Sequence, residues 1–569
     1  ANATIDDVID LQRSSVMDSK WGERDSHHAG TVLMSSLNYY PTYEEGHDGG
    51  SIDIVANRQS IADGINLRAA PYIGLYQRDD LGATGGSVHI DVAGLSGTQN
   101  IYIQDGMALI EDDMEALYLS ADIIESSGAD SFRISGTQSI VLEPGVQLAL
   151  GRNQGLELGA GYIQMLGDVR SLGGDVVLDA ADWVDVAGTI DVSGNWVNRR
   201  LDQVESSSLV SVLDAGTIDF AAGKSLVIED EARLRANAGA RLSADGKLQI
   251  GHAGEVALRL TDDGRPGASN APDRPALDMR GRVEALDNRQ GGQFSLVASD
   301  IRIGGDDPTR LLDSGGANPD TVTIANQWFD QLRVGNVTLS AREGDITLGS
   351  DADIRMHQHA YRESNGTAGT ISGDSIAGAL AHYEVPTYEA LAGSLTLQAG
   401  KTNSVSTKGS VVVEQGATIH GLYGSTLNLH ADEAILFDGT FRSKGGVFNA
   451  VLDQFETTDV PSIGNSIYLG ENAVIDLAAD MISRPGVNPA PSRDLIAAGQ
   501  VNLESNLGYV LVDESATISL QGGVFSGVED IQGVTRDVNR AAAAGTFKLK
   551  ADGGFVMAAE VDFGAAGQG

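Results

Sequence analysis

Close copies of the stretch Ala187-Gly-Thr-Ile-Asp-Val-Ser-Gly194 return along the whole chain. Each copy holds an apolar residue, usually isoleucine, among small and polar neighbours. The clearest other copies are Ala215-Gly-Thr-Ile-Asp-Phe220, Gly416-Ala-Thr-Ile-His-Gly421, Asn472-Ala-Val-Ile-Asp-Leu477 and Ser515-Ala-Thr-Ile-Ser-Leu520. Short strands with a turn signal every ~8–12 residues are typical of all-β proteins, and self-similarity along the chain indicates a solenoid. We therefore predict an all-β solenoid, which grows by stacking and offers surface rather than a deep pocket.

The strand rhythm is most regular between Gly86 and Gly194. In Val88–Val92, apolar residues alternate with polar ones, so one face of the strand is buried and the other is wet. The same pattern predicts strands at Ile101–Ile103, Leu117–Leu119, Phe132–Ile134, Ile140–Leu142, Gln147–Leu150, Leu156–Leu158, Val176–Leu178, Val184–Val186 and Thr189–Val192. Two or three such strands for each turn of the solenoid require about 20 residues per coil.

The composition fits thin stacked layers and excludes several function classes. The 569 residues include 71 glycines but only 5% aromatic residues, so the core must consist of Val, Ile, Leu and Ala. The net charge of −41 argues against binding to nucleic acid and to anionic lipid, because their phosphates would be repelled. We expect no cofactor, and calcium binding to some of the carboxylates is the alternative interpretation of the acidity.

The absence of cysteine removes thiol nucleophiles, thiolate metal sites and redox chemistry, and it suits a chain that folds after export. No apolar run approaches the ~18–20 residues of a transmembrane helix, and no signal peptide is visible. Because the chain starts at Ala1 without methionine, we expect a processed or excised segment.

The predicted organisation is an irregular N-terminal or insertion segment at 1–50, followed by a β-helix at 51–569. Segments rich in Pro, Gly, Asn and Asp interrupt the rhythm, and we interpret them as loops that leave the coil corners. These insertions lie near 262–281, 304–320, 355–393 and 482–499. The most convincing helical candidate lies around Ser375–His382.

The insertion at 355–393 is the best candidate for specific recognition. It is rich in His and Tyr, and it shares the tetrapeptide Pro-Thr-Tyr-Glu with residues 41–44. His357 and His359 alternate on an extended chain and could face the same way and share a metal ion, whereas Tyr383 and Tyr388 offer aromatic platforms suited to a sugar. A loop that merely packs over the rod is the competing interpretation. The candidate ligand-binding residues are His357, His359, Tyr361, His382, Tyr383, Tyr388 and Glu389.

The phrases Ala187–Gly194, Gly393-Ser-Leu-Thr-Leu-Gln-Ala399 and Val337-Thr-Leu-Ser-Ala-Arg-Glu-Gly-Asp-Ile-Thr-Leu348 resemble the repeats of filamentous-haemagglutinin-like large exoproteins, the passengers of two-partner secretion. The resemblance covers about residues 50–569. It implies a right-handed parallel β-helix, export through an outer-membrane transporter, and adhesion at the bacterial surface. The Asn-Pro-Asn motifs of the secretion domain are absent, so we expect an internal or C-terminal stretch of a longer polypeptide.

Enzymes that cleave polysaccharides also use β-helices. Asp112-Asp113, Gly251-His252 and Arg302-Ile303 follow the order of a polygalacturonase-like set, but no Asn-Thr-Asp occurs and many coils separate the three. The acidic run at 179–191 lacks a lysine that would serve as the base of a metal-assisted lyase.

The sequence thus favours a non-catalytic rod of a secreted adhesin at the bacterial cell surface, exported by an outer-membrane transporter. Its ligand would be a polysaccharide or a component of a host or bacterial cell surface. The alternatives are a carbohydrate-active β-helix enzyme and the inert stalk of a contact-dependent toxin-delivery protein.

Overall fold

The computed structural model describes residues 86–564 together with short strands before residue 56. Within 86–564, the residues left out are 93–99, 107–115, 128, 137, 199–211, 244, 262–276, 306–311, 314–320, 343, 364–378, 388, 391, 401–408, 454–463, 485–491, 507 and 532–533.

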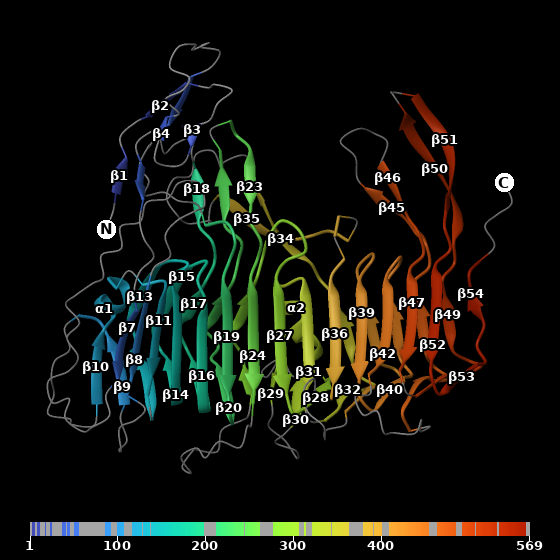
Figure 1. Cartoon of the computed structure of the whole chain (residues 1–569). Coiled ribbons are helices and arrows are strands. Elements are labelled where there is room, and N and C mark those ends of the chain that lie inside the picture. The colour runs from blue at the N-terminus through green and yellow to red at the C-terminus, as the bar shows by residue number, and fades with distance from the viewer. Residues whose placement is uncertain are drawn as a thin grey trace.

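Successive strands join three long, mainly parallel sheets in turn, so that the chain climbs along the axis of an elongated stack (Figure 1). Thr426 of one turn lies in parallel register with Val447 of the next, which agrees with a coil of about 20 residues. The strands predicted between residues 88 and 192 are all present, within one or two residues or as parts of longer strands. The chain is therefore all-β with long parallel sheets, an arrangement consistent with a parallel β-helix.

The first sheet contains β7 (Ser51–Val55), β8 (Ser87–Asp91), β11 (Ser131–Ser135), β14 (Gly155–Met165), β16 (Val176–Val186), β19 (Thr217–Ala222), β24 (Glu255–Leu260), β27 (Gln293–Ala298), β31 (Asn336–Ala341), β36 (Ser394–Ala399), β39 (Thr426–Ala431), β42 (Val447–Leu452), β47 (Gln500–Ser505) and β52 (Thr546–Ala551). The second sheet contains the ends of β14 and β16 with β9 (Asn100–Gln104), β10 (Ala116–Ser120), β12 (Ser139–Leu142), β20 (Ser225–Ile228), β25 (Leu277–Met279), β28 (Asp300–Ile303), β29 (Leu312–Asp313), β30 (Thr321–Ile324), β32 (Ile346–Leu348), β37 (Ser410–Val413), β40 (Ala434–Phe437), β43 (Ser466–Leu469), β48 (Tyr509–Val512) and β53 (Gly554–Met557).

The third sheet has two parts. They are β13 (Gln147–Arg152), β15 (Asp168–Leu172), β17 (Thr189–Asp191), β21 (Arg233–Arg235) and β26 (Arg282–Glu284), and then β33 (Asp353–Arg355), β38 (Thr418–His420), β41 (Thr440–Arg442), β44 (Val474–Asp476), β49 (Thr517–Ser519) and β54 (Val561–Asp562). A single bridge between Glu284 and Arg333 joins β26 to the segment before β31.

The alternating pattern of the sequence explains the core. Inward residues of all three sheets form one continuous apolar cluster, in which side chains such as Ile190, Phe220 and Phe448 are fully buried. The glycine of the repeated phrase serves close packing: a Cβ on Gly188 or Gly216 would lie within 2.0 Å of a carbonyl oxygen in the previous coil. In these two copies the close approach leaves no room for a side chain.

Two short helices occur in the described part of the chain, α1 (Ala121–Glu125) and α2 (Asn326–Gln331). No helix there is long and apolar enough to span a membrane. The helix predicted around Ser375–His382 is wrong where it can be compared, because Leu380–His382 lie in strand β35 (Leu380–Glu384). Pairing with β34 (His359–Glu363) overrides the local helical preference of this alanine-rich segment.

The predicted insertions have different structures. The one near 355–393 contains the β34–β35 hairpin, and the one near 482–499 contains β45 (Asp480–Arg484) and β46 (Ser492–Ile496), which are antiparallel. In the other two, residues 262–276, 306–311 and 314–320 lie outside the described residues, so the loop prediction is not tested there. Of the described remainder, β25 belongs to the second sheet and β29 adds a strand to it. Residues 1–50 include three short antiparallel pairs, namely β1 (Ala3–Ile5) with β6 (Tyr43–Glu45), β2 (Val8–Leu11) with β5 (Leu37–Tyr40), and β3 (Met17–Asp18) with β4 (Glu23–Arg24).

Candidate functional site

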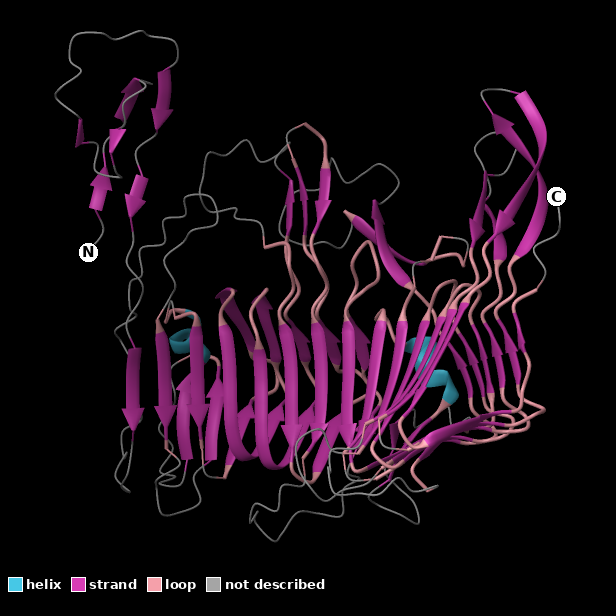
Figure 2. Cartoon of the chain, turned by 45° about the vertical axis from the view of Figure 1, so that its right-hand side comes forward, coloured by secondary structure: helices cyan, strands magenta, loops and turns pink. Residues whose placement is uncertain are grey.

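One corner of the stack, where the chain passes from the third sheet to the first, carries the strands that leave the three sheets after residue 86. These corner extensions are β18 (Trp196–Asn198), β22 (Ala240–Leu242) with β23 (Leu248–Ile250), the β34–β35 hairpin, the β45–β46 hairpin, and β50 (Gly523–Ile531) with β51 (Val534–Ala542). They project from the same side of the stack (Figures 1 and 2). The candidate site lies at the base of the β34–β35 hairpin.

The β34–β35 hairpin folds back over the neighbouring coils and is held there by main-chain contacts. The Tyr361 amide donates to the Asp287 carbonyl at 2.9 Å, and the buried Gln358 side chain donates to the Arg289 carbonyl. Leu380 packs in a small apolar cluster with Trp196, which comes from the extension four coils earlier. The hairpin base is therefore fixed against the body of the rod.

His357 lies between two carboxylates from separate elements. Its Nδ1 is 2.8 Å from a Glu384 oxygen on β35, and its Nε2 is 3.1 Å from an Asp330 oxygen on helix α2. Both carboxylates are at least half exposed, whereas His357 is about one-third exposed. The imidazole thus links the hairpin to α2.

His359 and His382 form a second pair, in which His359 is partly buried and His382 is exposed. His359 Nδ1 is 3.0 Å from His382 Nε2, and the rings stack with centroids 4.9 Å apart. The contact needs one nitrogen to carry the proton and the other to accept it. Burial, followed by the neighbouring His382, lowers the pKa of His359 from 6.5 to about 4, and burial also lowers the pKa of His382. His359 Nε2 is buried without a hydrogen-bond partner among the described residues.

Beneath the hairpin runs a row of alternating charges on the outer face of the third sheet. Arg170, Asp191, Arg235, Glu284 and Arg333 are successive register partners. Arg333 contacts Glu284 at 2.6 Å, and Arg235 reaches the same carboxylate at 3.6 Å.

Tyr361 lies close enough to this row for its charges to act on the phenol. Burial, and then the negative charges of Glu284 and Asp191, raise the pKa of Tyr361 well above its usual range. Its hydroxyl therefore stays protonated at physiological pH.

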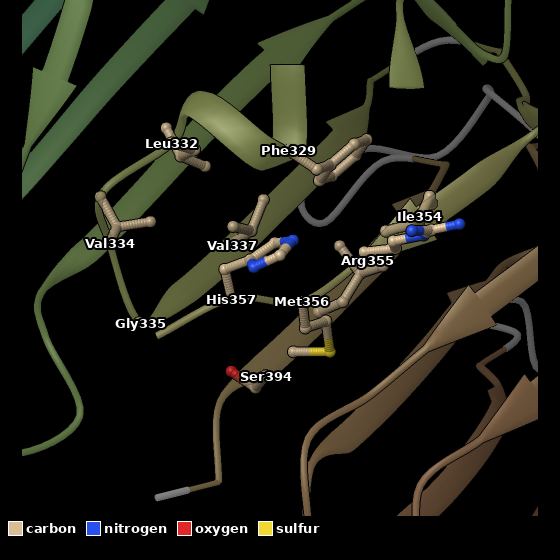
Figure 3. Close-up of a pocket in the computed structure, with 11 residues that line it drawn as sticks. Phe329, Leu332, Val334, Gly335, Val337, Ile354, Arg355, Met356, His357 and Ser394 are labelled. Carbon is tan, nitrogen blue, oxygen red and sulfur yellow. The ribbon is translucent and has the colours of Figure 1, made fainter. Parts of the chain in front are cut away.

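A shallow apolar cleft lies beside His357, between α2, β31 and β33 (Figure 3). Its empty volume of about 360 Å³ includes solvent at the mouth. Phe329, Val337 and Met356 line it together with the imidazole of His357. An apolar floor with one imidazole at its edge suits the face of a small ring or an aliphatic group.

The structure brings four of the predicted residues together. His357, His359, Tyr361 and His382 lie around the hairpin base, although His357 and His359 have different partners. Strand alternation places Tyr383 on the opposite face of the hairpin, where the Arg362 guanidinium lies 4.8 Å from its ring centroid.

The two remaining predicted residues follow strand β35 in the sequence. Glu389 lies in a turn after β35, where its amide donates to the Pro386 carbonyl at 2.8 Å. Tyr388 lies outside the described residues. No group of three or more His, Cys, Asp or Glu side chains suited to a metal ion occurs in the part of the chain that the structure describes.

Sequence reasoning missed Asp330, Arg333 and Glu284, because these residues precede the insertion by 20 positions or more and no local pattern marks them. It also found no lysine near the acidic run at 179–191. The structure corrects this: Lys224 of the following coil contacts Asp182, which is 1% exposed, at 2.5 Å. Coil stacking supplies partners that are distant in sequence.

Comparison with protein-family models, with curated proteins and with solved structures finds no match to this chain.

Proposed function

We propose that this chain is the adhesive rod of a secreted bacterial surface adhesin, folded as a right-handed parallel β-helix. The rod acts without catalysis and holds its corner extensions away from the cell. An outer-membrane transporter of the two-partner secretion type exports it, and a polysaccharide or another cell-surface component is its ligand.

The observation that carries the proposal is the common origin of the corner extensions. A coil has three corners, yet every antiparallel extension described after residue 86 leaves between the third sheet and the first. Because coils stack in register at ~4.8 Å, such extensions form a row along one edge of the rod. A row of this kind is suited to contacts with an extended ligand.

Within the row, the β34–β35 hairpin is the strongest candidate for ligand contact. Its outer face presents Tyr383 with Arg362, and its base carries His357 beside the apolar cleft. Aromatic faces stack on sugar rings, and charged side chains at their edges hydrogen-bond to hydroxyl groups.

A glycan array probed with the purified chain tests the proposal, with calcium and with chelator. His359 and Glu384 are register partners, so residues 360–383 can be replaced by an Asn-Gly turn that keeps the base. The matched control shortens the β45–β46 hairpin in the same way. We expect glycan binding by the parent chain and the control, and its loss in the first variant.

A point variant makes the result independent of hairpin folding. Tyr383→Ser removes the partly buried ring and keeps the buried Ala360 opposite it. Loss of binding in this variant supports a contact on the outer face. A folded parent chain that binds no glycan and no cell surface contradicts the adhesive function and favours the stalk.

A further inference from the structure

The outer faces of the first and third sheets carry polar or charged columns of side chains, whereas the second sheet carries an apolar column. On the first sheet, the outward column Asn428, Asn449 and Asn502 forms a ladder of side-chain hydrogen bonds of 2.7–2.8 Å. On the third sheet, the corresponding column in the N-terminal half alternates in charge, as in Asp191 and Arg235.

The outward column of the second sheet becomes apolar toward the C-terminus. It begins with Arg302 and Thr347 and continues through successive coils as one apolar stripe. The stripe consists of Val412, Leu436, Tyr468, Leu511 and Val556. It lies on the side of the stack away from the corner extensions (Figure 1).

These side chains are outward residues and do not belong to the core. Leu436 is 38% exposed and Tyr468 36%, whereas both sequence neighbours of each are fully buried. Val556 is 58% exposed. Since strands stack at ~4.8 Å, the five positions extend over about 19 Å along the rod.

Carboxylates border the stripe. Asp438 and Asp513 each follow their strand by one residue and, by alternation, lie on the same outer face as Leu436 and Leu511. Burial, and then the negative charges of Asp513, Asp438 and Glu471, raise the pKa of Tyr468. The apolar stripe with carboxylates beside it is complementary to a partner that has a row of apolar side chains with cationic side chains next to it.

We propose that the apolar stripe docks a cationic amphipathic helix of another protein. About 13 residues of α-helix cover 19 Å, and one apolar side chain per turn repeats every ~5.4 Å, close to the coil spacing of ~4.8 Å. Lysine or arginine beside that ridge pairs with Asp438, Glu471 and Asp513. A second copy of this chain is disfavoured, because its net charge of −41 places like charges together.

A synthetic peptide of about 13 residues, with Leu at helical spacing and Lys beside it, tests the proposal by calorimetry. A scrambled peptide of the same composition and a peptide with Glu in place of Lys are the controls. We expect the Leu–Lys peptide to bind on the order of tenfold more tightly than either control. Equal binding of the Glu peptide, or no binding of the Leu–Lys peptide, would overturn the proposal.

Two variants locate the contact. Leu436→Ser with Tyr468→Ser changes exposed side chains and is expected to weaken binding at least about tenfold, whereas Thr347→Ser in the same column is expected to leave it unchanged. Glu471→Gln with Asp513→Asn keeps the hydrogen-bond acceptors and should reduce both affinity and salt dependence.

Unchanged binding in the double serine variant would overturn the assignment. Self-association of the parent chain that this variant abolishes would assign the stripe to a second copy instead. Binding to phosphatidylcholine vesicles that is lost in the same variant would assign the stripe to a lipid surface.

Discussion

Docking of the β34–β35 hairpin should weaken as the pH falls from 6.5 toward 4. His359 has a pKa of about 4 in the docked hairpin and 6.5 when it is free, so the docked state binds fewer protons within this window. The neutral form of His359 therefore contributes its full stabilisation of the docked hairpin above pH 6.5. This contribution is lost as the pH falls from 6.5 toward 4. Because the imidazole keeps part of its contact with solvent, screening reduces the docking free energy that this pKa difference represents to about 1–2 kcal/mol.

Hydrogen exchange measures this loss directly. The Tyr361 amide donates to the Asp287 carbonyl only while the hairpin is docked, so its protection reports the docking equilibrium. After correction for intrinsic exchange, protection should fall by about tenfold between pH 6.5 and 4.5, because about 1.4 kcal/mol of docking free energy corresponds to a factor of ten. The lowered pKa of His382 acts in the same direction.

Two variants isolate the histidine. His359→Gln cannot take up the proton and should lose most of the pH dependence of Tyr361 protection. His252→Gln, on an exposed part of another coil, should keep it. Protection that stays constant from pH 7 to pH 4.5, or that falls equally in the parent chain and in His359→Gln, would refute the assignment.

Three further predictions concern the stack itself. Phe448→Ala removes a fully buried ring that packs edge-on against Phe437 at 5.1 Å; it should cost about 3–5 kcal/mol in urea unfolding of the C-terminal coils, whereas Leu436→Ala at the surface should cost less than about 1 kcal/mol. Asn449→Ala breaks two hydrogen bonds of the amide ladder and should cost about 1–2 kcal/mol in the same assay. Gly216→Ala places a Cβ 2.0 Å from the Gly174 carbonyl oxygen and should lower amide protection in β19 and β24 by about 1–3 kcal/mol, while Gly159→Ala, whose nearest neighbour is 3.9 Å away, should not.

The strands could be predicted because their cause is local. Alternation of apolar and polar residues, as in Val88–Val92, and the small residues around Ile190 specify where a strand lies and which side is buried. The short helices α1 and α2 were not predicted, because five or six residues carry too weak a periodicity. The helix around Ser375–His382 failed because strand pairing outweighed a local preference.

The candidate site shows the limit of local reasoning. A histidine-rich and tyrosine-rich insertion was visible in the sequence, and four of its members do meet at the hairpin base. The partners that give them their properties come from other coils: Asp330 from α2, Glu284 from β26, and Arg333 from the segment before β31. Tyr383 was grouped with them but faces away.

The sequence alone determined the all-β class, the positions of the coil strands and the acidic, cysteine-free surface, because each follows from composition or from neighbours a few residues apart. Only the tertiary structure decided which corner carries the extensions, that His357 meets Asp330, and that Val412 through Val556 form one stripe. These features depend on stacking register, which brings together residues 20 or more positions apart. A local pattern in the sequence does not show which of these distant residues will become neighbours on adjacent coils.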